Sequence, residues 1–150
     1  MYTIDVSFES GQSSDDIPLS DVENILEKTL KALDVKEGEL SVTFVSAERI
    51  RTLNREYRFK DESTDILSFV AKEGEFGGIE TPVLGDLVIS VDDLKENCDY
   101  FSVEMSEELI RLLVHGTLHL LGWDHTTNDQ SEPMLVMQEK VVTAIQKERG

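Results

Sequence analysis

The sequence predicts an α+β fold: a single domain over residues 1–150, with one mixed sheet of about four strands packed with helices. Three observations support this prediction. Strand patterns come early in the chain and helical patterns come late. A chain of 150 residues can bury roughly two thirds of its unfolded surface in one core. The sequence also contains no internal repeat, linker or low-complexity tract that would divide it.

The chain is predicted to begin with a strand followed by a helix. Residues 2–8 alternate between apolar and polar side chains, as a half-buried strand does. Ser20 followed by Glu23 has the form of a capping box. We therefore expect a helix that begins at Ser20 and runs through about Leu33.

The middle of the chain is predicted to hold the remaining strands. Residues 40–45 form a strand, and Ser46 caps a short helix that carries Ile50 and Leu53. Three glycines make residues 73–82 a mobile hairpin loop. The other predicted elements are strands at residues 66–70 and 84–91 and helices at residues 92–97, 104–121 and 132–148.

Composition restricts the class of protein. The single cysteine, Cys98, excludes an intramolecular disulfide and a cysteine-rich zinc knuckle, and it fits a reducing compartment. Its simplest role is that of a small buried apolar residue. The first residues lack the basic and apolar regions of a signal peptide, and no apolar run approaches eighteen residues. We expect a soluble cytoplasmic protein that does not contact membranes.

The net charge of −17 argues against a polyanionic partner, because phosphate binding uses Lys and Arg. Five of the fourteen basic residues nevertheless lie between positions 49 and 60, against a single acidic residue, Glu56. This basic segment is either a solvated helix face or a surface that binds an anionic partner. Its members are Arg49, Arg51, Arg55, Arg58 and Lys60.

All three histidines lie within eleven residues, which predicts a metal site. His115 and His119 stand four apart, so a helix places both imidazoles on one face. Gly122 can take the left-handed conformation that ends a helix, and the reversal would bring His125 to the same ion. Three protein ligands leave a fourth position for water, as in catalytic zinc sites.

The helix at residues 104–121 is apolar nearly all round but carries one polar stripe. A buried polar stripe usually faces a cleft or a metal. The alternative is that the histidines are hydrogen-bonded core residues and that Arg111 is tied to Glu108. The stripe consists of Glu104, Glu108, Arg111, His115 and His119.

The spacing of the histidines and of the glycine before the third one matches metzincin-type zinc proteases. Those enzymes use a glutamate directly after the first histidine as general base, and that position is Gly116 here. The usual route of peptide hydrolysis is therefore disfavoured. Phosphodiester cleavage needs only an activated nucleophile and positive charge, and Arg58 is the candidate for the charge. Its alternative role is a surface salt bridge to Asp61 or Glu62.

Three segments resemble the bacterial YbeY endoribonuclease family of rRNA maturation factors: LNREYRFKDESTDILSF, LGDLVIS and HGTLHLLGWDH, within residues 53–125. The resemblance implies a zinc-dependent, single-strand-specific endoribonuclease acting in 16S rRNA 3′-end maturation and ribosome quality control. It implies that His115, His119 and His125 are zinc ligands and that Arg58 acts in catalysis. The sequence departs from the family where Ser63 and Val70 replace common prolines and Trp123 replaces a tyrosine.

Three aspartates in these segments have less certain roles. Asp124, beside the third histidine, could orient an imidazole or cap the turn after Gly122. Asp65 and Asp86 lie near the starts of strands, where turn formation explains them, and we assign them no catalytic role.

The leading hypothesis from the sequence is a metal-dependent endoribonuclease with Arg58 and His115 in catalytic roles. One zinc ion per chain, or nickel or another divalent metal, would activate water or the RNA 2′-OH. The expected partners are single-stranded RNA and the small ribosomal subunit or its assembly factors. One alternative is a non-catalytic assembly factor whose metal has a fourth protein ligand, which only Cys98 could supply as a thiol. The other alternative is a metallopeptidase-like hydrolase.

Overall fold

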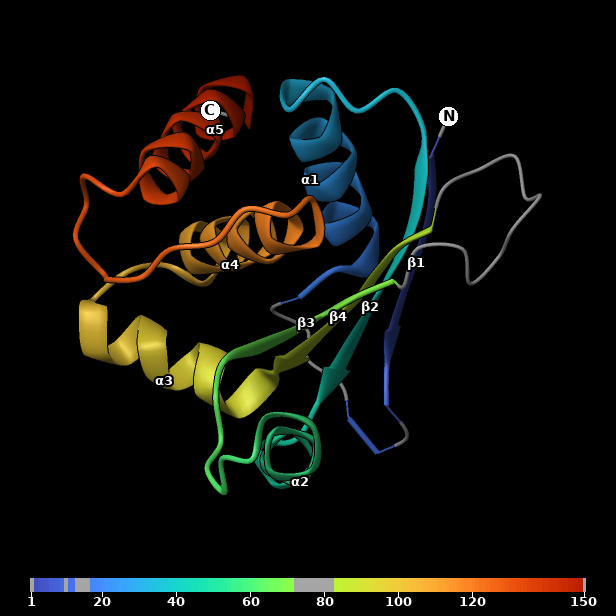
Figure 1. Cartoon of the computed structure of the whole chain (residues 1–150), viewed down its shortest axis with the longest axis vertical. Coiled ribbons are helices and arrows are strands. Elements are labelled where there is room, and N and C mark those ends of the chain that lie inside the picture. Colours follow the sequence, from blue (N-terminus) through green and yellow to red (C-terminus); the bar gives the residue numbers. More distant parts are fainter. Residues whose placement is uncertain (1, 10, 13–16, 72–82, 150) are drawn as a thin grey trace.

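A computed structural model describes residues 2–9, 11–12, 17–71 and 83–149. The predicted hairpin loop at residues 73–82 lies outside the described residues. Within them the chain forms four strands and five helices (Figure 1). The elements are β1 (Tyr2–Phe8), α1 (Leu19–Ala32), β2 (Gly38–Val45), α2 (Ala47–Arg58), β3 (Ile66–Val70), β4 (Val83–Ser90), α3 (Val91–Phe101), α4 (Met105–Leu120) and α5 (Pro133–Arg149).

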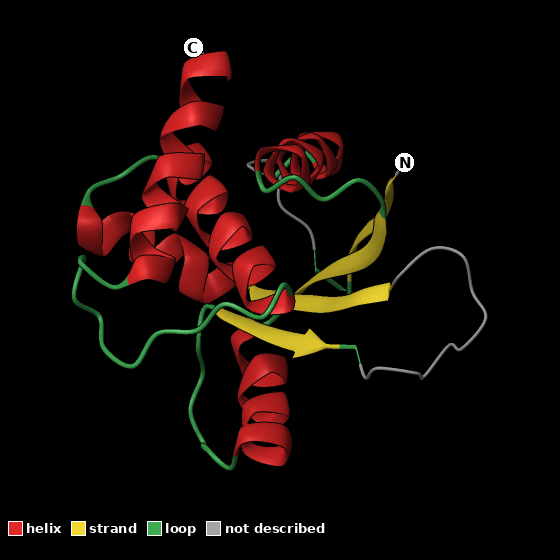
Figure 2. Ribbon diagram, turned by 45° about the horizontal axis from the view of Figure 1, so that its top comes forward, coloured by secondary structure: helices red, strands yellow, loops and turns green. Residues whose placement is uncertain are grey.

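The four strands form one mixed sheet in the order β1-β2-β4-β3, which confirms the predicted α+β class. β1, β2 and β4 are parallel, and β3 runs antiparallel to β4 at one edge. Helices cover both faces: α1, α4 and α5 lie on one side and α2 on the other (Figure 2). Because parallel strands need covered faces, this arrangement matches the apolar composition of β2 and β4.

The two faces of the sheet belong to two apolar clusters. The larger cluster joins the sheet to α1, α4 and α5, and Phe44, Leu87 and Leu113 within it have no exposed surface. The smaller one lies under α2 around Ile50 and Leu67. The alternation of side chains along β4 explains the division, because successive residues point to opposite faces. α4 therefore lies against the face of the sheet that belongs to the larger cluster. This packing fixes the position of its polar stripe.

The capping box predicted for the first helix was wrong, although the bounds of the helix agree with prediction within one residue at each end. α1 begins at Leu19, and its N-terminal cap is Pro18, which forms no side-chain capping hydrogen bond. The carbonyl oxygen of Pro18 accepts from the amides of Asp21 and Val22. Ile17, 2% exposed, anchors the chain in the core just before this turn. Burial of the preceding residue thus sets the helix start in place of the capping box.

Serine caps set the boundaries of two other helices. Ser46 accepts from the amide of Arg49, which confirms the predicted cap of α2. Ser90 accepts from the amide of Asp93, so the strand ends at Ser90 and α3 begins at Val91. α3 extends beyond the predicted residues 92–97 to Phe101. The helices α4 and α5 agree with prediction within one residue at each end.

Nothing among the described helices combines the length and the hydropathy needed to cross a lipid bilayer.

Candidate metal centre

The end of α4 brings the three histidines together. Gly122 has φ +96°, the left-handed conformation predicted for it. Its amide donates to the carbonyl of His119, and the amide of Trp123 donates to that of Leu118, the paired bonds of a Schellman motif. The chain therefore turns back at Gly122 and carries His125 to the face where the other two histidines lie.

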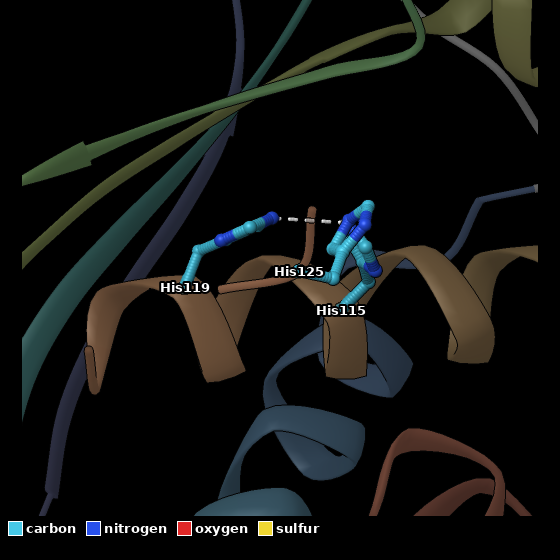
Figure 3. A group of neighbouring side chains, drawn as sticks. All are labelled: His115, His119 and His125. Carbon is cyan, nitrogen blue, oxygen red and sulfur yellow. Dashed lines mark hydrogen bonds between the residues drawn. The ribbon is translucent and has the colours of Figure 1, made fainter. Parts of the chain in front are cut away.

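The three imidazoles converge on one point. One potential ligand atom from each of His115, His119 and His125 lies within 4.8 Å of the other two. Figure 3 shows His119 pointing toward the other two rings. The Nε2 atoms of His115 and His119 are 3.1 Å apart. A tetrahedral zinc ion with Zn–N bonds of about 2.0–2.1 Å would hold two nitrogens roughly 3.3 Å apart, so the spacing fits such an ion.

Hydrogen bonds at Nδ1 orient all three rings. The Nδ1 atoms of His119 and His125 donate to the carbonyls of Trp123 (3.0 Å) and Thr127 (2.8 Å). The Nδ1 atom of His115 donates to Oε1 of Gln138 (2.6 Å). A carbonyl oxygen can only accept, so the protons lie on Nδ1 and the lone pairs lie on Nε2.

This tautomer fits a cation bound between the rings. Two Nε2 lone pairs facing each other at 3.1 Å repel unless a positive charge lies between them. Burial lowers the pKa of His115, which keeps its ring neutral and able to ligate. The donor set therefore fits a divalent metal, with the outer hydrogen bonds that metal-binding histidines usually have.

Gln138 was not anticipated from the sequence. It lies on α5, where Nε2 of its amide donates to Glu139 (3.1 Å), and this bond turns its oxygen toward His115. Arg111 binds Glu139 with two nitrogens, at 3.0 and 2.9 Å, and lies 3.6 Å from Glu107. The pairing of Arg111 with Glu108, considered as the alternative explanation of the polar stripe, is therefore replaced by pairing with Glu139 and Glu107. The contact depends on how α5 packs on α4, and no periodic pattern in the sequence reports that packing.

Gly116 faces the sheet. A Cβ atom there would lie 2.7 Å from Cδ1 of Ile66 and 2.8 Å from Cδ2 of Leu87. α4 approaches the sheet closely because this residue has no side chain. The glutamate of the metzincin proteases would therefore enter the packed core, which gives a structural reason for its absence.

Arg58 lies in the same cleft as the histidines, a cavity of about 1210 Å³. Its guanidinium donates to the carbonyls of Ser68 (2.7 Å) and Tyr57 (3.3 Å) and lies 5.0 Å from the centre of the Phe69 ring. These contacts replace the surface salt bridge considered for it. Asp61 pairs with other arginines, so Arg58 is held by neutral groups and keeps its charge available.

The remaining residues of the basic segment divide into two groups. Lys60 lines the cleft together with Arg58. Arg49 pairs with Glu9 (3.2 Å), and Arg51 and Arg55 pair with Asp61 (2.9 and 3.9 Å). These three arginines are therefore partly neutralised, and the structure places only two of the five basic residues at the cleft.

Asp124 and Cys98 were considered as partners of the metal site, and the structure shows other contacts for both. Oδ1 of Asp124 accepts from the amide of His125, as a turn-forming residue does. Cys98 packs against the main core and does not belong to the histidine group in the described part of the chain. Burial raises the pKa of its thiol, which disfavours the thiolate needed for a ligand.

The sequence did not indicate that two carboxylates come together in the cleft. Asp65 and Glu108 line the cleft and share one donor, Nδ2 of Asn97, at 3.0 and 3.4 Å. Glu108 is only 8% exposed, and this burial raises the pKa of its carboxyl. The polar stripe of α4 indicated Glu108. Its partners, Asn97 on α3 and Asp65 just before β3, are brought to it only by the tertiary fold.

Comparison with known proteins agrees with the segments noted in the sequence. A family model described as endoribonuclease YbeY matches residues 7–146. A Bacillus pumilus protein named endoribonuclease YbeY is 43% identical over 147 residues, which cover 93% of this chain and 92% of that protein. A Bacillus subtilis protein of the same name is 40% identical and covers 94% of each chain.

A solved structure shows a similar fold. The solution structure of TM1509 from Thermotoga maritima superimposes with a TM-score of 0.64 at 28% identity. The match covers 97% of this chain and 91% of that one. The whole described architecture therefore has an experimentally determined counterpart.

Proposed function

The chain belongs to the endoribonuclease YbeY family, and on that premise we propose that it is a metal-dependent endoribonuclease that cleaves single-stranded RNA. Family membership supports the endoribonuclease activity. One observation carries the metal dependence: three imidazole Nε2 atoms converge in one cleft, and each ring is fixed by a hydrogen bond at Nδ1. In this proposal residues 1–150 form a single catalytic domain.

The proposed metal ligands are His115, His119 and His125, with one zinc ion per chain. The bound ion would supply Lewis-acid activation of a water molecule or of a phosphate oxygen. Imidazole also binds nickel and other divalent transition metals, so the choice of zinc follows the family resemblance and the tetrahedral spacing of the nitrogens. His115 is both a ligand and a catalytic residue in this scheme, because its buried, neutral ring faces the cleft.

Arg58 is proposed to bind the phosphate that is cleaved. Carbonyl oxygens of Tyr57 and Ser68 occupy two of the five N–H donors of its guanidinium, which leaves three for phosphate oxygens. Negative charge grows on those oxygens during cleavage, so a donor fixed in place beforehand favours the transition state. Both water and the RNA 2′-OH are compatible with this role as the attacking group.

The basic residues near Arg58 are proposed to contact the RNA backbone. Lys60 already lines the cleft and can do so directly. Arg49, Arg51 and Arg55 would have to exchange their present carboxylate partners for phosphate. Asp124 is proposed to support His125 through the backbone of the turn.

In the cell, we propose roles in 16S rRNA 3′-end maturation and ribosome quality control. The proposed partners are therefore rRNA and the small ribosomal subunit or its assembly factors, in the cytoplasm. Resemblance of the three sequence segments to rRNA maturation factors supports this assignment. Mapping the 16S rRNA 3′ ends in cells that lack the protein tests it, and normal ends would contradict it.

The test of the enzymatic proposal is a chelation and add-back series with purified protein. The substrates are defined single-stranded and duplex RNA of the same sequence. We expect single-stranded cleavage that chelator abolishes and zinc restores, no cleavage by His115→Ala, and strongly slowed cleavage by Arg58→Ala. Cleavage at the wild-type rate by His115→Ala would overturn the metal assignment. A metal-loaded wild-type protein that never cleaves RNA would instead support the non-catalytic assembly factor.

A further inference from the structure

An exposed aromatic pair at the end of α3 contributes one ring to the wall of the cleft. Phe101, the last residue of α3, lines the cleft and is 60% exposed. Tyr100 is 81% exposed and packs edge-on against it, with ring centres 4.9 Å apart. Contiguous exposed apolar surface often marks a binding site. Here Tyr100 packs against the ring of Phe101, which lies at the wall of the cleft.

Hydrogen-bond acceptors line the same cleft as that aromatic ring. Asn97 and Phe101 are four residues apart on α3, so they share one helix face. Asn97 donates to both Asp65 (3.0 Å) and Glu108 (3.4 Å). Each carboxylate has further lone pairs beyond the one that Asn97 uses, and both line the cleft.

Charged groups of both signs line the cleft. Glu108 and His115 lie seven residues apart on α4, which corresponds to about 10 Å along the helix. Asp65 directly precedes β3, whereas Arg58 binds the carbonyl of Ser68 further along that strand. The imidazoles, Arg58 and Lys60 suit an anion. Phe101, Asp65 and Glu108 add an aromatic face and two carboxylates, and Arg111, which also lines the cleft, is engaged by Glu139 and Glu107.

A nucleotide has the complementary polarity. Its phosphate is anionic, and its base has a flat face and, in cytosine, adenine and guanine, an amino group that donates hydrogen bonds. Carboxylates repel phosphate, so the positions beside Asp65 and Glu108 disfavour the RNA backbone. A base can enter there, because its face stacks on aromatic rings and its amino group donates to carboxylates.

We propose that Phe101, Asp65 and Glu108 form a nucleobase subsite, in which Phe101 stacks on one base of single-stranded RNA and the carboxylates accept from its amino group. This inference rests on the proposed function and deepens it by naming how the substrate is held. It also accounts for RNA binding by a chain of net charge −17. Stacking requires no positive charge on the protein. Three of the five residues of the basic segment are already paired with carboxylates.

Binding and cleavage of labelled oligonucleotides test the subsite separately. Fluorescence anisotropy with the metal-loaded protein measures binding to a single-stranded oligocytidylate whose 2′-OH groups are methylated to prevent cleavage by 2′-OH attack. Phe101→Ala should weaken binding about tenfold, the loss typical of one stacked base, while Phe101→Trp retains it. The dependence of affinity on salt should stay the same, because no charge is removed.

Phe59→Ala is the matched control. Phe59 is 89% exposed and lies between Arg58 and Lys60 in sequence, but its side chain does not line the cleft. We expect wild-type binding from this variant. Equal binding by Phe101→Ala and wild type would overturn the subsite and would point to protein docking as the use of the aromatic pair. Loss of binding by both variants equally would overturn it as well.

Base preference tests the role of the carboxylates. Wild type should bind oligocytidylate more tightly than oligouridylate, which lacks the amino group. Glu108→Met, which removes the acceptor oxygens at similar volume, should narrow this difference. An unchanged preference in Glu108→Met would overturn the role of Glu108. Parallel cleavage assays on unmodified RNA separate the two hypotheses. If wild type binds in a Phe101-dependent manner but never cleaves, the subsite stands and the endonuclease assignment fails. If wild type cleaves RNA but Phe101→Ala has the same KM, the endonuclease assignment stands and the subsite fails.

Discussion

His115 and Gln138 form a hydrogen bond of 2.6 Å between α4 and α5, although they stand 23 residues apart. The bond holds the His115 ring with its Nε2 atom toward the other histidines. Gln138 is itself held by Glu139, which binds Arg111 of α4. The helix α5 therefore contributes to the candidate metal centre by orienting one of its histidines.

Replacing Gln138 should weaken metal binding. Gln138→Leu keeps the volume but removes the acceptor, so we expect a loss of affinity of roughly 10- to 100-fold. Competition with a chromophoric chelator measures the affinity. Gln138→Glu, which keeps an acceptor at the same place, is the control and should bind metal at least as tightly as wild type. Equal affinities for Gln138→Leu and wild type would show that the bond does not orient the ligand.

Metal binding should stabilise the folded protein. A metal at a hundred times its Kd adds about 2.7 kcal/mol to the free energy of unfolding if only the folded state binds it. Thermal melts of metal-free protein with added zinc check this increase. Magnesium, which prefers oxygen ligands, is the control ion and should produce no shift. His119→Ala should also show little or no shift with zinc, and a full shift in that variant would contradict the assignment of the site.

Substitution of Arg58 should slow cleavage without affecting metal content. Arg58→Ala is expected to lower kcat by about 100- to 1000-fold, the usual cost of removing a donor that stabilises a charged transition state. Arg58→Lys should recover only part of the rate, because lysine keeps the charge but lacks the planar fork. Single-turnover rates together with zinc analysis check both points. A loss of zinc in Arg58→Ala would mean that the arginine acts on the fold of the site.

Gly116 should tolerate no side chain that reaches into the core. Gly116→Glu places a carboxylate against Ile66 and Leu87, so we expect it to unfold the protein or to lower its free energy of unfolding by several kcal/mol. Gly116→Ala is the milder control: it gains up to about 1 kcal/mol in helix propensity, and overpacking costs about 1–3 kcal/mol. Denaturant unfolding measures both variants. A folded Gly116→Glu protein with peptidase activity would refute this explanation for the missing glutamate.

Glu108 should make stability depend on pH. Burial raises the pKa of its carboxyl, against the lowering influence of Arg111. The folded state therefore binds this proton more tightly than the unfolded state does. The resulting stability is fully present below the unfolded pKa and is lost as pH rises through the folded pKa. Glu108→Gln does not titrate and can still accept from Asn97, so its Tm should exceed that of wild type at neutral pH.

Thermal melts across about pH 4 to pH 7.5 check the Glu108 prediction. The advantage of Glu108→Gln should shrink toward the acid end, where the wild-type carboxyl is also neutral. An advantage that stays constant over this range would show that the effect is unrelated to ionisation.

Most of the secondary structure could be predicted from the sequence, because local patterns determine it. The strand at residues 66–70 and the cap at Ser46 depend only on neighbouring residues, and both were confirmed. The capping box predicted at Ser20 was wrong: the helix begins one residue earlier, at Leu19, after Ile17, which a tertiary contact buries in the core. The end of α3 extended further than its pattern indicated, to the left-handed residue Ser102.

The sequence alone determined the grouping of the three histidines, because their convergence needs only a helical turn and a glycine that reverses the chain. Tertiary structure alone decided what surrounds them. The acceptor for His115 comes from α5, and the carboxylates and aromatic ring that line the cleft come from the start of β3, from α4 and from α3. Such contacts join segments far apart in the chain through packing, and packing leaves no fixed spacing in the sequence.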